Sequence, residues 1–245
     1  MSDLFQTADK GSVPFIKLKL CVVIILVGFA LAACDRNYSD KEVREALHIR
    51  DNQTNEVWVG GVHFRIPAEY KIENIDIHQD KMRAGKYKDV LNQVWFSTHG
   101  STWIDPSLSN SASSGIYAVA IKDGGFEPPD ALQIFLNRPW VKTRDIPEWA
   151  LREYLSKNYT DASWGDIAFL ALDMKTPKGG PIVYFCLDER LHKGDDNFNL
   201  GRCRLAYQLP EGPRVEYGMN YKLMPRWEEV HKKIVDTINS FIVHE

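Results

Sequence analysis

The feature that most constrains this chain is an apolar run close to its amino terminus. Lys17 and Lys19 precede an eleven-residue apolar run, Leu20–Ala30. A helix that spans a membrane needs about 20 apolar residues, so this run is too short for one. A run of roughly 7–15 apolar residues, with positive charge before it and small residues after it, is typical of a secretory signal peptide. The sequence therefore predicts that the protein is exported.

Small residues and a cysteine follow the run, in the order Leu31-Ala32-Ala33-Cys34. This tetrapeptide resembles the lipobox of bacterial lipoproteins. The resemblance implies cleavage before Cys34, with a diacylglycerol on its thiol and a third acyl chain, such as palmitate, on its new amino group. A plain secretory signal with an unrelated cysteine, or a short anchor helix, are the alternatives. We expect a lipoprotein because charge, length, small residues and cysteine occur in the right order.

The residue after the cysteine, Asp35, bears on which membrane would hold the anchor. In enteric lipoproteins an aspartate at this position acts as an inner-membrane retention signal. The resemblance thus implies the periplasmic face of a Gram-negative envelope, with the inner membrane favoured and the outer membrane as the alternative.

The chain divides into a signal peptide (1–33), a polar tether (34–55) and a globular domain (56–245). Processing would leave 212 of the 245 residues, enough for one large domain or two small ones. Within the tether, the run Ser39-Asp40-Lys41-Glu42 has the spacing of a capping box. We expect a short helix from there to about Leu47.

Charge excludes one class of partner. After residues 1–33 are removed, 27 Lys and Arg and 31 Asp and Glu remain, a formal charge of −4. Because no basic block could follow a phosphate backbone, nucleic acid is not expected as a partner. A hydrophobic content of 44% predicts a folded domain with a core rather than a disordered chain.

Cysteine usage agrees with export. Of the four cysteines, Cys21 would leave with the signal peptide and Cys34 would carry lipid. The remaining two, Cys186 and Cys203, form an even pair in an oxidising compartment, which predicts one disulfide. Two free buried thiols or half of a metal site are the alternatives. The disulfide is favoured over zinc because the chain has no CxxC motif and no neighbouring ligand His.

Many short strands and two longer helices are expected in the globular domain. The strand candidates are 57–59, 62–66, 90–98, 115–122, 131–136, 167–174, 181–187, 203–209 and 215–222. A helix is expected over 147–157, with Pro147 in its first turn, and an amphipathic helix over 226–243. This pattern favours an α+β fold, a mainly antiparallel sheet with a mid-chain helix and a carboxyl-terminal amphipathic helix.

The sequence contains no motif that would carry catalysis. It lacks a G-x-S-x-G elbow, an H-E-x-x-H pair, a P-loop and a G-x-G-x-x-G fingerprint. The oxygen-rich run 195–199 lacks the glycine and the terminal Glu of a calcium loop, so we interpret it as a solvated hairpin tip. We expect a protein that is not an enzyme and that holds neither a metal nor a cofactor.

Two stretches of the mature chain carry a second resemblance. The run 57–70 (VWVGGVHFRIPAEY) and the helix from Trp227 to Ser240-Phe241 resemble small proteobacterial lipoproteins encoded beside type VI secretion phospholipase effectors. Together they cover about 30 of the 212 mature residues. The resemblance implies an immunity protein, which binds a phospholipase-type toxin in the periplasm and blocks its active-site entrance or its membrane docking.

Binding of a protein partner would place function in loops held by a sheet. Aromatic and Arg side chains most often anchor protein interfaces, so the candidates are Trp103 in the Ser-rich stretch 99–114, and Arg190 and Phe198 in the polar stretch 188–201. Packing of Trp103 on the core is the alternative for that residue. Two other functions stay open, an envelope structural or assembly lipoprotein and a hydrolase whose site is not visible in the sequence.

The lipobox generates the first testable prediction. Replacement of Cys34 by Ala should abolish incorporation of labelled palmitate, because the acceptor thiol is lost, and should leave an uncleaved or soluble species. Palmitate incorporation that is unchanged in the variant would contradict the assignment.

Overall fold

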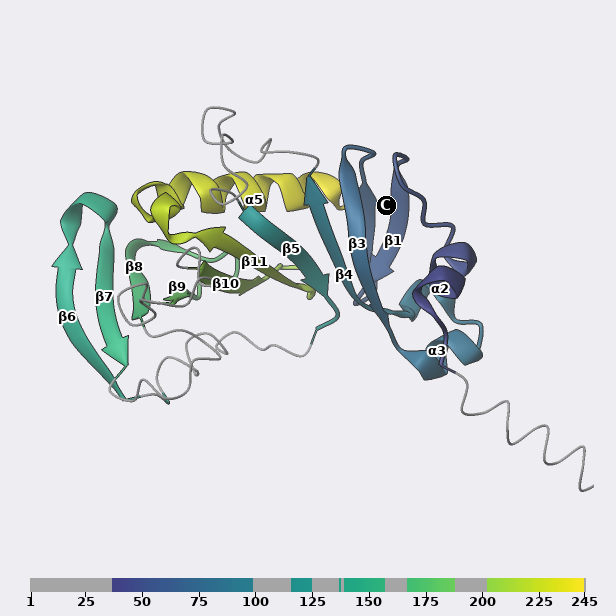
Figure 1. Ribbon diagram of the computed structural model, residues 1–245, viewed down its shortest axis with the longest axis horizontal. Helices are drawn as coiled ribbons and strands as arrows, with labels where there is room; N and C mark the ends of the chain where they lie inside the picture. Colours follow the sequence, from purple (N-terminus) through teal and green to yellow (C-terminus); the bar gives the residue numbers. More distant parts are fainter. Residues whose placement is uncertain are drawn as a thin grey trace, which may run out of the picture. The chain divides into compact units, whose positions relative to one another are not determined.

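The computed structural model describes residues 37–98, 116–124, 137, 139–156, 167–187 and 202–244 (Figure 1). The chain forms two units, Met1–Ser39 and Asp40–Glu245. Cys34, Asp35 and the apolar run lie outside the described residues. No helix among the described residues is long and apolar enough to cross a membrane.

One sheet of eleven strands dominates the second unit. Its strands are β1 (Asn55–Val59), β2 (Val62–Ile66), β3 (Tyr70–Ile77), β4 (Leu91–Thr98), β5 (Ile116–Lys122), β6 (Trp140–Ile146), β7 (Leu151–Ser156), β8 (Ile167–Lys175), β9 (Pro181–Cys186), β10 (Arg202–Gln208) and β11 (Arg214–Asn220). The order is β2-β1-β4-β5-β11-β10-β9-β8-β7-β6, and β3 also pairs with β4. Neighbouring strands run antiparallel, apart from the single parallel bridge between β1 and β4.

Within the described ranges, the helices are few and mostly short. They are α2 (Asp40–Ala46), α3 (Gln79–Arg83), α5 (Trp227–Phe241) and the 3-10 helices η1 (Tyr87–Asp89), η3 (Pro147–Trp149) and η4 (Tyr221–Arg226). The predicted α+β class, with a mainly antiparallel sheet and a carboxyl-terminal amphipathic helix, is confirmed. The strand predicted over 131–136 lies outside the described residues.

The first hairpin forms where the sequence predicts it. Gly60 and Gly61 have φ angles of 56° and 78°, which suit the tight turn between β1 and β2. A Cβ on Gly60 would lie 2.9 Å from Oδ1 of Asp123, so a larger residue would be crowded as well as strained there. Alternating side chains of the two strands are buried, namely Val57, Val59, Phe64 and Ile66.

The longest helix among the described residues, α5, covers one face of the sheet (Figure 1). Its buried side chains recur at helical spacing: Trp227, Val230, His231, Ile234, Thr237, Ile238 and Phe241. At one end the Trp227 indole N–H donates a 2.6 Å hydrogen bond to the carbonyl oxygen of Trp149. At the other end the Phe241 ring lies 5.7 Å from that of Phe96 and 4.9 Å from that of Tyr70. Each fully buried large apolar side chain contributes about 1.5–3 kcal/mol.

Both ends of the described chain are fastened to the sheet. After α5, Ile242 forms a bridge with Phe64, and the Val243 N–H donates to the His63 carbonyl, which covers part of edge strand β2. In α2, the Arg44 guanidinium donates to the carbonyl oxygen of Ile72 in β3 at 2.9 Å. The compact unit therefore begins at Asp40 and includes much of the segment that the sequence predicted to be a tether.

The helix predicted over 147–157 is largely wrong. Only η3 is helical, and it ends because Ala150 adopts a left-handed conformation with φ 50°. Residues 151–156 instead form β7, in which Leu151 and Glu153 are buried and Arg152 and Tyr154 only half-buried. The spacing of apolar residues in this short stretch is compatible with a helix or with a strand. The stretch forms a strand because it pairs with β8.

Strand β6 is absent from the sequence prediction. Five of its seven residues are exposed, so it shows no hydrophobic alternation. Polar contacts with β7 hold it instead. The Arg152 Nε donates to Asp145 at 2.7 Å, and the Thr143 hydroxyl donates to the buried Glu153 carboxylate at 2.6 Å. A β-bulge lies between Lys142 and Arg144. Two residues of β6, Thr143 and Arg144, therefore lie opposite Glu153.

The predicted disulfide is confirmed. Cys186 and Cys203 are bonded and lie opposite each other on β9 and β10, with their Cα atoms 4.0 Å apart. The bond closes the chain between two residues that are 17 positions apart.

Loss of this bond should lower stability measurably. A loop of this size is worth about 3 kcal/mol in the chain-entropy model, which corresponds to roughly 6–12 °C in melting temperature for a domain of this length. The variant Cys186→Ala/Cys203→Ala should therefore melt at a lower temperature than the oxidised protein in calorimetry. The thiol-reduced wild-type protein is the control and should behave like the variant. Equal melting temperatures for oxidised protein and variant would contradict the estimate.

Candidate partner-binding site

The three residues proposed from the sequence to contact a partner, Trp103, Arg190 and Phe198, lie outside the described residues. The strands that flank the two stretches are described. The pairing register of these strands shows at which end of the sheet the flanking strand ends lie.

Four strand termini meet at one end of the sheet. Ile116 at the start of β5 is opposite Met219, and Met219 is opposite Cys203 near the start of β10. Cys203 is in turn opposite Cys186, the last residue of β9. Thr98 ends β4 at the same end, because β4 and β5 pair antiparallel in this region. The stretches that hold Trp103 and those that hold Arg190 and Phe198 are thus connected to the same end of one sheet.

The two faces of the central strands differ in chemistry. Successive side chains of a strand point to opposite faces. Phe96 in β4 contacts Phe241, and Tyr217 in β11 is hydrogen-bonded to His231, so these positions face α5. The intervening positions face away from α5. Across β4, β5, β11 and β10 they form two rows, Trp95-Ala120-Glu216-Ala206 and Gln93-Lys122-Arg214-Gln208.

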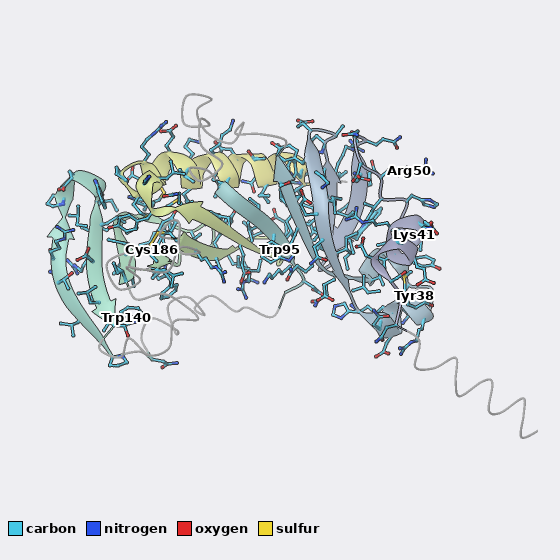
Figure 2. All side chains as sticks on the ribbon, in the orientation of Figure 1. Tyr38, Lys41, Arg50, Trp95, Trp140 and Cys186 are labelled. Atoms are coloured by element: carbon cyan, nitrogen blue, oxygen red, sulfur yellow. A yellow bond between two sulfur atoms is a disulfide. The ribbon has the colours of Figure 1, made fainter. Side chains whose placement is uncertain are left out.

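A charged cluster lies in the middle of these rows. The Lys122 ammonium is 2.5 Å from Oε2 of Glu216, and the Arg214 guanidinium pairs with the other oxygen of the same carboxylate. The side chains of Lys122, Glu216 and Arg214 are 25%, 20% and 10% exposed. The Lys122 ammonium also lies 5.4 Å from the ring centroid of Trp95, a residue labelled in Figure 2. We call Trp95, Lys122, Arg204, Arg214 and Glu216 the charged face.

Positive charge is in excess on the charged face. Arg204 in β10, opposite Gly218, is exposed and makes no ion pair within the described part of the chain. Burial lowers the pKa of Lys122, and the neighbouring charges of Arg214 and Arg204 lower it further, whereas Asp76 opposes them. Three cations thus lie near two carboxylates, those of Glu216 and Asp76, so an additional negative charge near them would be stabilised.

The opposite side of β11 is held by a buried hydrogen-bonded chain. The hydroxyls of Tyr184 and Tyr217 are 2.6 Å apart, and the Tyr217 hydroxyl is 2.9 Å from Nδ1 of His231. Burial raises the pKa values of both tyrosines and lowers that of His231 to about 4, so all three groups are neutral at pH 7. This chain fixes the strand that carries Glu216.

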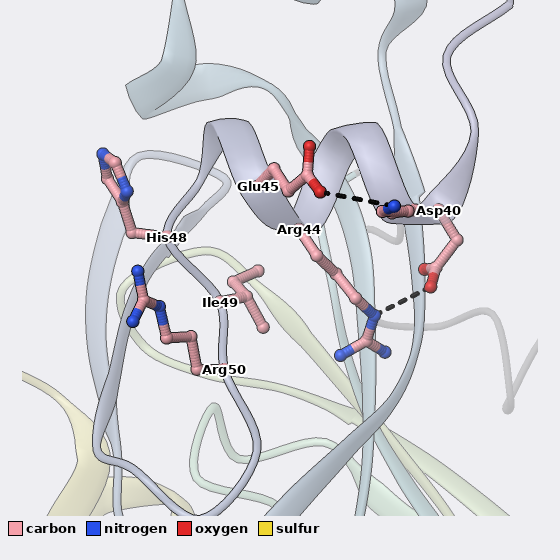
Figure 3. A pocket seen from close by; sticks show the side chains of 7 residues that line it. Asp40, Arg44, Glu45, His48, Ile49 and Arg50 are labelled. Carbon is pink, nitrogen blue, oxygen red and sulfur yellow. Dashed lines mark hydrogen bonds and ion pairs between the residues drawn. The ribbon is translucent and has the colours of Figure 1, made fainter.

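A surface pocket of about 450 Å³ lies at α2 (Figure 3). Its lining residues are Asp40, Lys41, Arg44, Glu45, His48, Ile49 and Arg50. Arg44 pairs with Asp40 at 2.8 Å, and Lys41 pairs with Glu45 at 3.9 Å.

Among the residues that the structure describes, one histidine–carboxylate pair resembles part of a catalytic site. Nε2 of His78 lies 3.0 Å from Oδ2 of Asp123, and the Lys81 ammonium is 3.9 Å from the same oxygen. A nucleophilic mechanism needs a hydroxyl or thiol within hydrogen-bond reach of the base. Among the described residues, no such group is hydrogen-bonded to His78, and no group of three His, Cys, Asp or Glu is arranged to hold a metal.

No family model matches the chain, and no curated protein or solved structure is significantly similar to it.

The charged face was not predicted from the sequence, although the alternation of polar residues that forms it is present there. Trp95, Lys122 and Glu216 occupy the polar alternate positions of strands that the sequence predicted. What the sequence does not give is the strand order that brings these positions together.

The buried histidine generates a prediction on pH dependence. The folded-state pKa of His231, about 4, lies below its ordinary value of 6.5, so the unfolded state binds the extra proton between these values. The free energy of unfolding should therefore rise by roughly 3 kcal/mol from pH 4 to pH 6.5 on account of this group. Denaturant titrations at several pH values in this range give the free energy of unfolding. This free energy should rise less steeply with pH for His231→Gln than for wild type.

The matched control for this experiment is His244→Gln, since His244 is exposed. Its unfolding free energy should follow the wild-type pH dependence. If His231→Gln keeps the full wild-type slope between pH 4 and 6.5, protonation of the buried imidazole is not what limits stability there.

Proposed function

We propose that the protein is a membrane-anchored periplasmic lipoprotein that acts as an immunity protein, binding and occluding a cognate type VI secretion toxin of the lipase type. The lipobox at Cys34 supports the anchor. The resemblance of 57–70 and 227–241 to immunity lipoproteins supports the toxin class.

The two resembling stretches correspond to structural elements in the fold. The first includes most of β1 and all of β2, and the second is α5. They build the sheet and cover one of its faces, so their likeness concerns the scaffold rather than a set of reactive groups. A scaffold of this kind supports function by binding.

The observation that carries the binding proposal is the convergence of strand termini at one end of the sheet. Thr98 and Ile116 flank one long stretch, Cys186 and Arg202 flank another, and all four lie at that end. Residues of two separate stretches can thus contribute to one surface. A composite surface of this kind suits an interface of about 1,200–2,000 Å².

The anchor would place the inhibitor where a phospholipase acts. Cys34 and Asp40, the first residue of the compact unit, are six positions apart. At about 3.3–3.6 Å per residue, this segment reaches at most roughly 20 Å. A tether of this length raises the effective concentration of the inhibitor at the membrane without any new contact.

A hydrolase is the second candidate, and the His78–Asp123 pair is the observation that favours it. Such an enzyme would protect by turnover and would act below a one-to-one ratio. Replacement of His78 by Gln would then remove protection, whereas an occluding inhibitor would keep it.

Titration of the effector encoded beside this gene, hereafter the adjacent effector, with the mature protein distinguishes these functions. We expect its lipase activity to fall linearly with added mature protein and to reach its minimum at a fixed stoichiometry, with His78→Gln indistinguishable from wild type. Complete inhibition at a small fraction of one equivalent, with cleaved or altered toxin, would indicate an enzyme instead.

A deletion strain tests the same proposal in cells. We expect it to be killed by a kin attacker that carries the adjacent effector and to be rescued by the wild-type gene. Survival equal to that of the parent, with no second copy of the gene, would contradict immunity and would favour an envelope structural role.

A further inference from the structure

We propose that the charged face docks an acidic surface of the toxin, with Arg204 and Trp95 as its principal anchors. This inference rests on the proposed function, because it names the chemistry of the partner's contact surface. It also assigns a contact role to residues that are separate from Trp103, Arg190 and Phe198.

The charge balance selects the chemistry of the partner. Lys122 and Arg214 both pair with the carboxylate of Glu216, whereas Arg204 is exposed and makes no ion pair with a described residue. A carboxylate brought to Arg204 by a partner would complete this arrangement with a charge-assisted, bidentate hydrogen bond. A basic surface would meet uncompensated like charge, so the face discriminates between partners.

The side chains on this face are also those that anchor interfaces. Trp and Arg are enriched among the residues that dominate binding energy. Trp95 is half-buried and lies under the Lys122 ammonium, which restricts both side chains before a partner arrives. Restricting a side chain in advance lowers the entropy that binding would otherwise cost.

The central strand beneath these residues is held by contacts on the opposite side of the sheet. Tyr217, between Glu216 and Gly218, is held by the buried chain to His231. A Cβ added to Gly218 would meet only the Cys203 carbonyl oxygen, at 3.7 Å, which is ordinary contact. Gly218 thus presents no side chain on this face, and a larger residue there would add bulk where the partner would dock.

The face is continuous with the end of the sheet described above. Arg204 is two positions after the first residue of β10, and Trp95 is three positions before the last residue of β4. A partner that contacts the end where those strand termini meet would thus lie next to the charged face.

Charge reversal at Arg204 tests the inference. We expect Arg204→Glu to weaken binding of the adjacent effector at least tenfold, mainly through slower association, and to flatten the dependence of the association rate on salt. Arg204→Lys keeps the charge and should lose less. The matched control is Arg50→Glu, since Arg50 is also an exposed arginine but lies in the α2 pocket.

A second variant tests the same face without changing charge. Gly218→Leu should also weaken binding at least tenfold, through obstruction and therefore mainly through faster dissociation. Circular dichroism and melting temperature establish that each variant is folded before binding is measured.

The outcomes separate the two proposals. Weak binding of Arg204→Glu and Gly218→Leu with normal binding of Arg50→Glu supports the charged face. If both face variants bind and inhibit the effector as wild type does, this inference is overturned and the immunity function stands. If wild type itself neither binds nor inhibits the effector, the immunity function fails and the inference fails with it.

Discussion

The packing of α5 across the sheet is the interaction on which the rest of the structure depends. Trp227, at the start of the helix, lies 5.9 Å from the Tyr184 ring in β9, and Phe241, at its end, lies 5.7 Å from the Phe96 ring in β4. One helix thus spans the strands from β4 to β9. Because its apolar residues are buried against both ends of this span, neither half of the sheet has a complete core without it. The short chain after α5, which pairs with β2 at Phe64, extends the same attachment to the edge of the sheet.

The two faces of the sheet therefore have different roles, one in the core and one at the surface. The face that receives α5 supplies the core and includes the neutral chain from Tyr184 to His231, whose groups satisfy one another's hydrogen bonds. The other face of the same central strands is therefore free to hold charge. Lys122, Arg214 and Glu216 lie there, partly buried and paired, on a backbone that is fixed from behind. A rigid sheet with a preformed charged surface suits a protein that acts by binding.

Much of the fold could be predicted from the sequence because alternation is a local signal. The hairpin at Gly60-Gly61, the paired Cys186 and Cys203 and the helix that starts at Trp227 all depend on neighbouring residues or on composition. The stretch 147–157 could not be predicted correctly, since its strand character is decided by pairing with β8. Strand β6 could not be found by periodicity either, because polar contacts such as that of Arg152 with Asp145 hold it. The charged face depends on strand order, a non-local property, so its residues appeared in the sequence only as the polar positions of separate strands.

Hydrogen–deuterium exchange of the mature protein, alone and with one equivalent of the adjacent effector, tests the central claim most directly. That claim is that the sheet, held by α5 on one side, binds the toxin with the other side and with the end where β4, β5, β9 and β10 terminate. The account predicts that peptides from β4, β5, β10 and β11 gain protection in the complex, while those from α2 and from the β6–β7 hairpin do not change. Protection confined to α2 or to the β6–β7 hairpin would contradict it.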